Sequence, residues 1–267
     1  MSQKDFNLSV LDRPEILRFI FYPRPNLYPR PRVSNAQDHL IEVEEGIRIG
    51  CRLYTAGQDF PTLLYFHGNG EIIEDYDYIA PFYNQIEINL FVADFRGYGL
   101  SGGSPTVAST IRDAHSIFKE FVKIIEAKGY KRALFVMGRS LGSASAIELA
   151  LHYQRELKGI IIESGFANGF RLLACLGVRI KEPTKLEEEY FSNEEKIKSV
   201  HIPTLAIHGE YDHLIPPSEG RRLYENAAAT EKGFLLIPKG DHNDLMLVGK
   251  EQYFNKIKEF VRNVLKF

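Results

Sequence analysis

The hydrophobic residues of the chain fall into short runs that are separated by longer amphipathic stretches. Residues 39–54 alternate apolar and polar side chains around Glu45 and Gly46, which predicts an antiparallel hairpin. Six later runs are almost continuously apolar, as is typical of strands buried on both faces of a sheet. These runs are TLLYF (62–66), NLFVADF (89–95), RALFVMG (132–138), GIIIES (159–164), PTLAIHG (203–209) and GFLLIP (233–238).

Helical periodicity occupies the intervals between these runs. Alternation of strand and helix favours right-handed crossovers and a mostly parallel sheet flanked by helices, in the α/β class. Ligands of such sheets bind at the carboxyl ends of the strands, so the residues that follow each run are the candidates for chemistry. The predicted helices lie around 71–86, 106–128, 141–154, 217–229 and 251–265.

Two segments fall outside this alternation. Residues 1–38 contain the short apolar stretch ILRFIFY and the Pro/Arg-rich stretch PRPNLYPRPR, and we expect an N-terminal arm packed across the body. Residues 39–267 would then form a single domain. Within it, the interval 165–202 is too long for a simple crossover, which predicts a small cap or lid over the carboxyl edge of the sheet. An ordinary long crossover is the alternative.

Composition narrows the function classes. A chain of 267 residues, 44% hydrophobic, suits one packed domain, and its net charge of −2 favours neither nucleic acid nor an anionic membrane as a partner. No apolar stretch approaches the roughly 18 residues that span a bilayer, and the first residues do not resemble a signal peptide. We therefore expect a cytoplasmic protein without a transmembrane segment. Cys51 and Cys175 are expected to be reduced thiols.

Ser140 lies between a strand-like run and a helical stretch, in MGRSLGSA. A serine on a tight strand-to-helix turn needs small residues two positions to either side, because larger side chains would clash with the adjacent strand and helix. Gly138 and Gly142 meet this demand. The amides at the start of the helix favour negative charge beside the hydroxyl. The spacing predicts Ser140 as a nucleophile; a serine helix cap with flanking glycines is the alternative.

A serine hydroxyl needs a base to take its proton and an acid to orient that base. Among the eight histidines, His242 follows the last strand-like run, and a loop at this position can fold back to the serine. We predict that His242 is the base. Asp212 follows PTLAIHG and precedes an Ile-Pro-Pro turn, and it is the predicted acid. Glu163, at the end of GIIIES, and Asp241, beside His242, are alternative acids.

Acyl transfer also needs two donors for an oxyanion. The backbone N–H of Leu141, directly after the predicted nucleophile, is the expected first donor. The run TLLYF ends in His67-Gly68-Asn69-Gly70, a loop of small residues that lets the backbone approach a ligand. The N–H of Asn69 is the expected second donor, and a plain turn is the alternative. His67 is expected to brace this loop by hydrogen bonding rather than to act as a base.

Neither a metal nor a cofactor is predicted. The glycine-rich stretch 96–103 lacks the G-x-x-x-x-G-K-[ST] pattern of a phosphate-binding loop, and its glycines do not open a helix at dinucleotide spacing. Asp94 and Arg96 are expected to pair or to bond backbone groups, and so to hold this stretch beside the site.

With these motifs in hand, the chain resembles the α/β-hydrolase superfamily, and within it the serine-hydrolase branch that includes the Bem46-like and ABHD17-like proteins. The resemblance implies an α/β-hydrolase fold with an eight-stranded, mostly parallel sheet, and hydrolysis of esters or thioesters without a cofactor. It implies the same roles for Ser140, Asp212, His242, Asn69 and Leu141. The chain departs from many relatives at Glu71, which puts a carboxylate near the site. The motifs are FHGNGE (66–71), DFRGYGLSGG (94–103), GRSLGS (138–143), HGEYDHLIP (208–216) and GDHND (240–244).

The sequence therefore predicts a serine hydrolase that cleaves small-molecule carboxylic esters or thioesters through an acyl-enzyme. A peptidase or amidase of the same fold is one alternative, because the same three side chains serve both reactions. A binding protein that kept the fold and lost turnover is another. A degenerate site would usually have lost at least one part, whereas every part is present in this chain.

Overall fold

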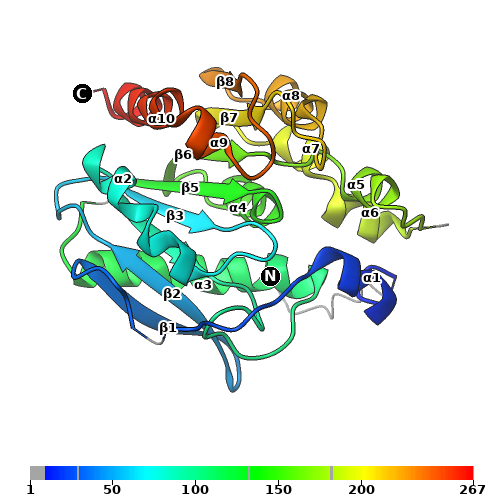
Figure 1. The fold of residues 1–267 in the computed structure, drawn as a ribbon, viewed down its shortest axis with the longest axis horizontal. Helices are drawn as coiled ribbons and strands as arrows, with labels where there is room; N and C mark the ends of the chain where they lie inside the picture. The colour runs from blue at the N-terminus through cyan, green and yellow to red at the C-terminus, as the bar shows by residue number, and fades with distance from the viewer. Residues whose placement is uncertain (1–9, 29, 132, 181–182, 267) are drawn as a thin grey trace.

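An eight-stranded sheet forms the centre of the molecule in the computed structural model, which describes residues 10–28, 30–131, 133–180 and 183–266 (Figure 1). The strand order is β1-β2-β4-β3-β5-β6-β7-β8. The first two strands form the predicted hairpin and β2 pairs antiparallel with β4, whereas all other pairs are parallel. The strands are β1 (Ala36–Glu44), β2 (Ile47–Tyr54), β3 (Thr62–Phe66), β4 (Asn89–Ala93), β5 (Leu134–Arg139), β6 (Leu157–Glu163), β7 (Thr204–Gly209) and β8 (Lys232–Ile237).

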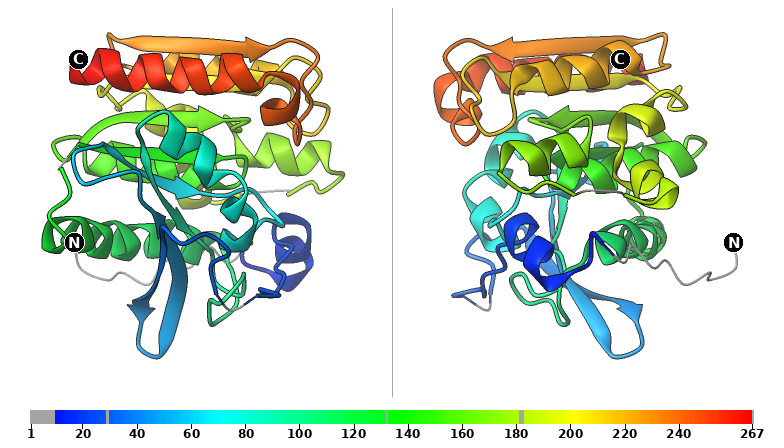
Figure 2. Two further views of the ribbon diagram at one scale, coloured as in Figure 1. Left: turned by 60° about the vertical axis from the view of Figure 1, so that its left-hand side comes forward. Right: turned by 90° about the vertical axis from the view of Figure 1, so that its right-hand side faces the viewer.

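The central strands are buried because helices cover both faces of the sheet (Figure 2). Every residue of β3, β4, β5 and β7 is buried, which explains their nearly continuous apolar sequences. Full burial of each large aliphatic or aromatic side chain contributes roughly 1.5–3 kcal/mol. The predicted eight-stranded, mostly parallel α/β architecture is confirmed.

The helices divide into two layers with separate hydrophobic cores. One core receives side chains from α1, α3, α4, α5, α6, α7 and α8, and the other from η1, α2, α9 and α10. The bounds are α1 (Pro14–Ile20), η1 (Ile73–Asp77), α2 (Ala80–Gln85), α3 (Val107–Ala127), α4 (Gly142–His152), α5 (Gly169–Cys175), α6 (Lys185–Phe191), α7 (Asn193–Ile197), α8 (Pro217–Asn226), α9 (Leu245–Val248) and α10 (Lys250–Leu265).

The segment before β1 and the segment between β6 and β7 meet beyond the carboxyl ends of the strands, where Figure 1 shows α1, α5 and α6. The backbone N–H groups of Val10 and Leu11 donate to Glu187 Oε1 of α6, at 2.8 and 3.3 Å. The N–H of Tyr22 donates to Asn69 Oδ1 at 2.7 Å, so the first segment also reaches the loop after β3. The division into arm, domain and cap, and the gating role of residues 165–202, stay predictions.

Two simpler findings concern the described residues. Within them, no helix combines the length and the apolar character needed to cross a bilayer. Cys51 is buried and Cys175 is exposed, and both are free thiols.

Candidate active site

Ser140 lies on the turn that joins β5 to α4. Its backbone φ is +50°, in the left-handed region that residues other than glycine rarely adopt. Hydrogen bonds hold this conformation: the Ser140 N–H donates to the Glu163 carbonyl oxygen at 2.8 Å, and the Ser140 carbonyl oxygen accepts from the Ser143 hydroxyl at 2.6 Å. The strained turn presents the side chain beyond the end of the strand.

Gly138 and Gly142 are required by close backbone approach. A Cβ atom on Gly138 would lie less than 3.0 Å from the carbonyl oxygen of Gly142, and one on Gly142 would lie less than 3.0 Å from that of Phe66. Both neighbours are backbone atoms, which cannot move aside as a flexible side chain can. The predicted need for small residues on both sides of Ser140 is confirmed.

Ser140, His242 and Asp212 form one hydrogen-bonded chain, although they come from the ends of three different strands. His242 Nε2 lies 3.0 Å from Ser140 Oγ, and His242 Nδ1 lies 2.7 Å from Asp212 Oδ2. All three residues are buried. Because a carboxylate can only accept, the Nδ1 atom must carry the proton that faces Asp212, which leaves Nε2 free to accept the serine proton. The structure thus brings together the predicted nucleophile, base and acid.

Four donors converge on the carboxylate of Asp212. Its Oδ1 accepts from the N–H groups of Leu214 and Ile215, at 3.1 and 2.8 Å, and its Oδ2 faces His242 Nδ1. His208 Nε2 lies 3.2 Å from Oδ2 and is shared with the Ile215 carbonyl oxygen, at 2.8 Å. Burial alone would raise the pKa of Asp212, but hydrogen bonds from the two histidines and from the backbone outweigh it and lower that pKa. Asp212 is therefore ionised at neutral pH.

The two alternative acids are engaged elsewhere. Glu163 Oε2 accepts from the Tyr253 hydroxyl at 2.6 Å, and its Oε1 lies 3.2 Å from Arg139 Nε. Burial raises the pKa of Glu163, and the charge of Arg139 opposes that rise. Asp241 Oδ1 accepts from the backbone N–H of His242, at 2.6 Å, rather than from its ring. The geometry therefore favours Asp212 as the partner of the imidazole.

The loop after β3 is held by hydrogen bonds on several sides. His67 Nδ1 lies 2.8 Å from the Gly68 carbonyl oxygen, and its Nε2 lies 3.1 Å from Asp94 Oδ1, so the predicted bracing role of His67 is confirmed. Asn69 uses its side chain: Oδ1 accepts from the Tyr98 hydroxyl at 2.6 Å as well as from Tyr22. Within the described ranges, the backbone N–H groups of Asn69 and Leu141 donate to no acceptor.

Asp94 and Arg96 do not pair with each other. Asp94 Oδ1 accepts from the Ile73 N–H at 2.8 Å, so Asp94 bonds a backbone group, the second of the two expected arrangements. Arg96 instead binds Asp113, with Nε 2.6 Å from Oδ2, and Glu44, with Nη2 2.9 Å from Oε2. Arg96, the first residue of the glycine-rich stretch 96–103, is thus tied to Asp113 and Glu44, whereas Asp94 bonds to Ile73 and His67 outside that stretch.

The sequence analysis missed Arg139, which directly precedes the serine. This arginine is buried and contacts the His242 loop, Glu163 and Glu71. Glu71, expected to put a carboxylate near the site, forms an ion pair with Arg139. Burial would raise the pKa of Glu71, but the nearby Arg139 charge lowers it. No local pattern marks these contacts, because the partners lie far apart in the sequence.

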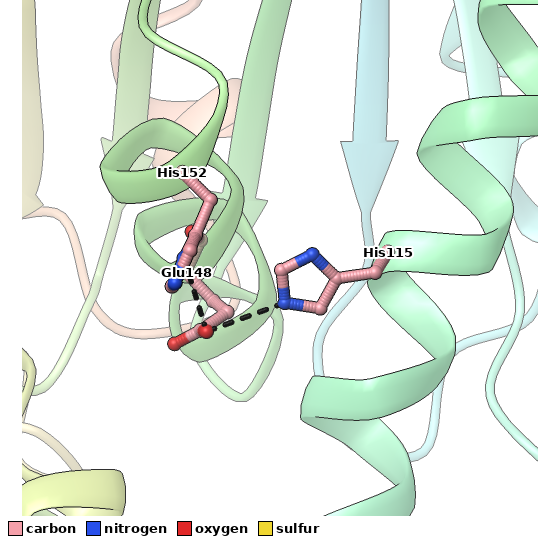
Figure 3. A group of neighbouring side chains, drawn as sticks. All are labelled: His115, Glu148 and His152. Atoms are coloured by element: carbon pink, nitrogen blue, oxygen red, sulfur yellow. Dashed lines mark hydrogen bonds and ion pairs between the residues drawn. The ribbon is translucent and has the colours of Figure 1, made fainter. Parts of the chain in front are cut away.

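Figure 3 shows a second polar cluster at the opposite end of α4 from Ser140. His115 Nε2 and His152 Nδ1 lie 3.3 and 3.2 Å from Glu148 Oε1, a donor set that zinc uses in proteins. However, Lys196 Nζ lies 2.7 Å from Glu148 Oε2 and already neutralises the carboxylate. Burial would raise the pKa of Glu148, but these hydrogen bonds and charges outweigh that effect and lower the pKa to about 2. The cluster fits a structural ion pair better than a metal site.

Known proteins are similar to this chain in sequence and in fold. A family model described as "Serine aminopeptidase, S33" matches residues 58–174. Protein bem46 of Schizosaccharomyces pombe is 28% identical over 243 residues, which cover 87% of this chain and 79% of that protein. Human alpha/beta hydrolase domain-containing protein 17B is 28% identical over 233 residues, 85% of this chain and 75% of that protein. The Pyrococcus furiosus esterase Pf2001 superposes with a TM-score of 0.73 at 20% identity, covering 91% of this chain and 99% of that one.

The sheet order, the flanking helices and these matches define an α/β-hydrolase fold. In sequence, the chain is similar to the Bem46-like and ABHD17-like proteins of that superfamily. The resemblance derived from the motifs is confirmed.

Proposed function

We propose that the protein is a serine hydrolase that cleaves carboxylic esters or thioesters through an acyl-enzyme. The observation that carries this proposal is the continuous link from Ser140 Oγ to His242 Nε2, at 3.0 Å, and from His242 Nδ1 to Asp212 Oδ2, at 2.7 Å. Similarity to a hydrolase family over residues 58–174 and the fold shared with the esterase Pf2001 support it.

In the first half of the reaction, Ser140 Oγ attacks the substrate carbonyl carbon while His242 Nε2 takes the hydroxyl proton. The carboxylate of Asp212 stabilises the imidazolium that results. The backbone N–H groups of Leu141 and Asn69 donate to the oxyanion, and each such donor is worth roughly 3 kcal/mol. When the tetrahedral intermediate collapses, His242 gives its proton to the departing alkoxide or thiolate, and the acyl group stays on Ser140.

In the second half, water replaces the leaving group. His242 takes a proton from the water as its oxygen attacks the acyl carbon, and the same two amides hold the second oxyanion. Collapse of this intermediate returns the proton to Ser140 Oγ and releases the carboxylic acid. The cycle consumes one ester and one water and needs no further reactant.

Cleavage of amides or peptides is a second candidate, favoured by the aminopeptidase description of the matching family model. The same residues would serve, with an amine as the leaving group. The two candidates differ in kcat/KM for paired substrates, such as a nitrophenyl ester and an aminoacyl nitroanilide with the same acyl part. A higher value for the amide would replace the ester proposal with an amidase.

A fluorophosphonate probe tests the nucleophile, because it reacts with activated serines. We expect labelling of the wild type that is lost in Ser140→Ala. Ser145→Ala is a matched control, since Ser145 is also buried on α4 and its hydroxyl donates to the Thr110 carbonyl oxygen at 3.2 Å. Labelling that survives in Ser140→Ala would refute the assignment. Absence of turnover on every ester and amide tested would instead favour a binding protein of this fold.

A further inference from the structure

Arg139 is a buried cation at the end of β5, next to the proposed nucleophile. Its side chain is 7% exposed, and all three guanidinium nitrogens have partners. The partners come from three separate segments of the chain: the loop after β3, the end of β6 and the loop after β8. One side chain therefore connects three of the strand ends that meet at the site.

The first connection is to the loop of His242. Arg139 Nη2 donates to the His242 carbonyl oxygen at 2.7 Å and to Asn243 Oδ1 at 2.8 Å. These two bonds hold the backbone at His242 and at the next residue. The imidazole reaches Ser140 Oγ from that backbone, so a shift of the loop would lengthen the contact between Nε2 and Oγ.

The second connection is to the loop of Asn69. Arg139 Nη1 binds Glu71 Oε1, and Glu71 Oε2 accepts from the Gly68 N–H at 2.9 Å and from the Tyr76 hydroxyl at 2.8 Å. The guanidinium also packs directly on the backbone, because a Cβ atom on Gly68 would lie less than 3.0 Å from Arg139 Nη1. The residue that follows Gly68 is Asn69, the proposed oxyanion donor.

The third connection keeps the guanidinium in one orientation. Arg139 Nε lies 3.2 Å from Glu163 Oε1, whose carboxylate also accepts from Tyr253. A planar guanidinium can satisfy donors in several fixed directions at once, whereas a lysine ammonium is a single point charge. Buried ions need such complete pairing, because loss of one partner leaves a buried charge without compensation.

We propose that Arg139 is a positioning residue: by binding both loops from one buried guanidinium, it fixes the base His242 and the oxyanion loop at Asn69 in place relative to each other. The inference rests on the proposed function, because it assigns a role in that reaction to a side chain that does not touch the substrate. Mutation of groups that orient the ligands of a metal site costs about 10–100-fold in activity, and we expect an effect of that size for a group that orients a catalytic base.

Activity measurements on Arg139→Met and Arg139→Lys form the first arm of the test. We expect the rate of fluorophosphonate labelling, and kcat for a nitrophenyl ester, to fall about 100-fold in Arg139→Met, as for a misplacement of about 1 Å, with KM little changed. Arg139→Lys should not restore the rate, because lysine cannot reach three segments together. Asn243→Ala removes one of the two bonds to the His242 loop, and Glu71→Gln removes the carboxylate charge that pairs with Arg139. Each should lower the rate about 10-fold.

Nuclear magnetic resonance of the histidine rings forms the second arm and needs no turnover. In the wild type we expect a downfield, slowly exchanging Nδ1–H resonance of His242, assigned by its absence in His242→Gln. The resonance should exchange rapidly with water in Arg139→Met. Arg52→Met is the matched control: Arg52 is also a buried arginine paired with two carboxylates, Asp38 and Asp77, on the β2 side of the sheet. It should keep both the resonance and the labelling rate.

The outcomes separate the two proposals. A wild type that shows the resonance but neither labelling nor turnover would refute the hydrolase proposal. The His242 resonance in the Arg139 variants would still test whether Arg139 positions the imidazole. Labelling within twofold of wild type together with an unchanged resonance in Arg139→Met would overturn the positioning role. An equal loss in Arg52→Met would also overturn it, since general destabilisation would then explain the effect. If Arg139→Met does not fold, Asn243→Ala and Arg139→Lys decide in the same way.

Discussion

Replacement of Asp212 by asparagine tests the electrostatic design of the site, because it alters one atom and nearly preserves shape. Every partner of the Asp212 carboxylate is a donor: two backbone N–H groups face Oδ1, and the rings of His208 and His242 face Oδ2. An asparagine offers one acceptor and one NH2 donor, so the NH2 group must face donors in either orientation.

The backbone donors decide which orientation is adopted. They cannot change their protonation, and each buried N–H left without an acceptor costs about 1–3 kcal/mol. The NH2 group therefore turns toward His242, whose ring can adapt by moving its proton from Nδ1 to Nε2. In that tautomer Nε2 carries a proton and cannot accept the one on Ser140. A serine hydrolase with the wrong tautomer loses about 10⁴-fold in kcat, which corresponds to about 5 kcal/mol in the activation barrier.

The assay is the second-order rate of fluorophosphonate labelling, with far-UV circular dichroism to establish folding. Asp113→Asn is the control for loss of a buried carboxylate, since Asp113 binds Arg96 with Oδ2 2.6 Å from Nε. We expect Asp212→Asn to label about 10⁴-fold more slowly and Asp113→Asn to label at nearly the wild-type rate. Labelling of a folded Asp212→Asn variant within tenfold of wild type would refute the tautomer argument.

Three further predictions concern the turn at Ser140, the polar cluster at the opposite end of α4, and the surroundings of Asp212. Gly142→Ala should lower the free energy of unfolding, measured with urea, by about 1–3 kcal/mol or more, because the new Cβ would overlap the Phe66 carbonyl group. Gly102→Ala should leave the free energy of unfolding unchanged, because the atoms nearest to its new Cβ lie 3.9 Å away. Equal stability of the two variants would contradict the packing argument. The pKa of Glu148 is lowered from 4.5 to about 2 in the folded chain. The ionised carboxylate therefore stabilises the fold fully at pH values above its pKa in the unfolded chain. Up to about 3 kcal/mol is then lost as the pH falls from about 5 to 2. Glu148→Gln should flatten this acid dependence in urea titrations at several pH values, and an unchanged slope would contradict it. His208→Ala, which removes a donor from Asp212, should slow labelling about 10-fold, whereas a rate equal to wild type would show that His208 does not orient the acid.

The strands could be predicted from the sequence because burial on both faces leaves a signal within each run. β3 begins and ends where TLLYF does, and the other runs differ from their strands only near the ends. α1 gave no comparable signal. It is a seven-residue helix, too short for helical periodicity, and its stability comes from packing of residues such as Ile20 on the core rather than from local preference.

Some residues of the candidate site could likewise be predicted from the sequence, and others could not. Ser140, Asp212 and His242 each follow a strand, so topology alone predicted that they meet. Arg139 and His208 could not be assigned roles, because their function depends on which atoms lie within hydrogen-bonding distance in the folded chain. The contact of Arg139 with Asn243 spans 104 residues, and the one with Glu163 spans 24. Only the three-dimensional arrangement connects those segments.

A rapid-mixing experiment with nitrophenyl acetate tests the central claim most directly. The account predicts a burst of nitrophenol stoichiometric with enzyme, followed by slower turnover, and an acetyl group on the Ser140 peptide when the reaction is quenched with acid during the burst. The burst and the acetylated peptide should both vanish in Ser140→Ala. An acetyl group on another residue, or a burst of equal size in Ser140→Ala, would contradict the account.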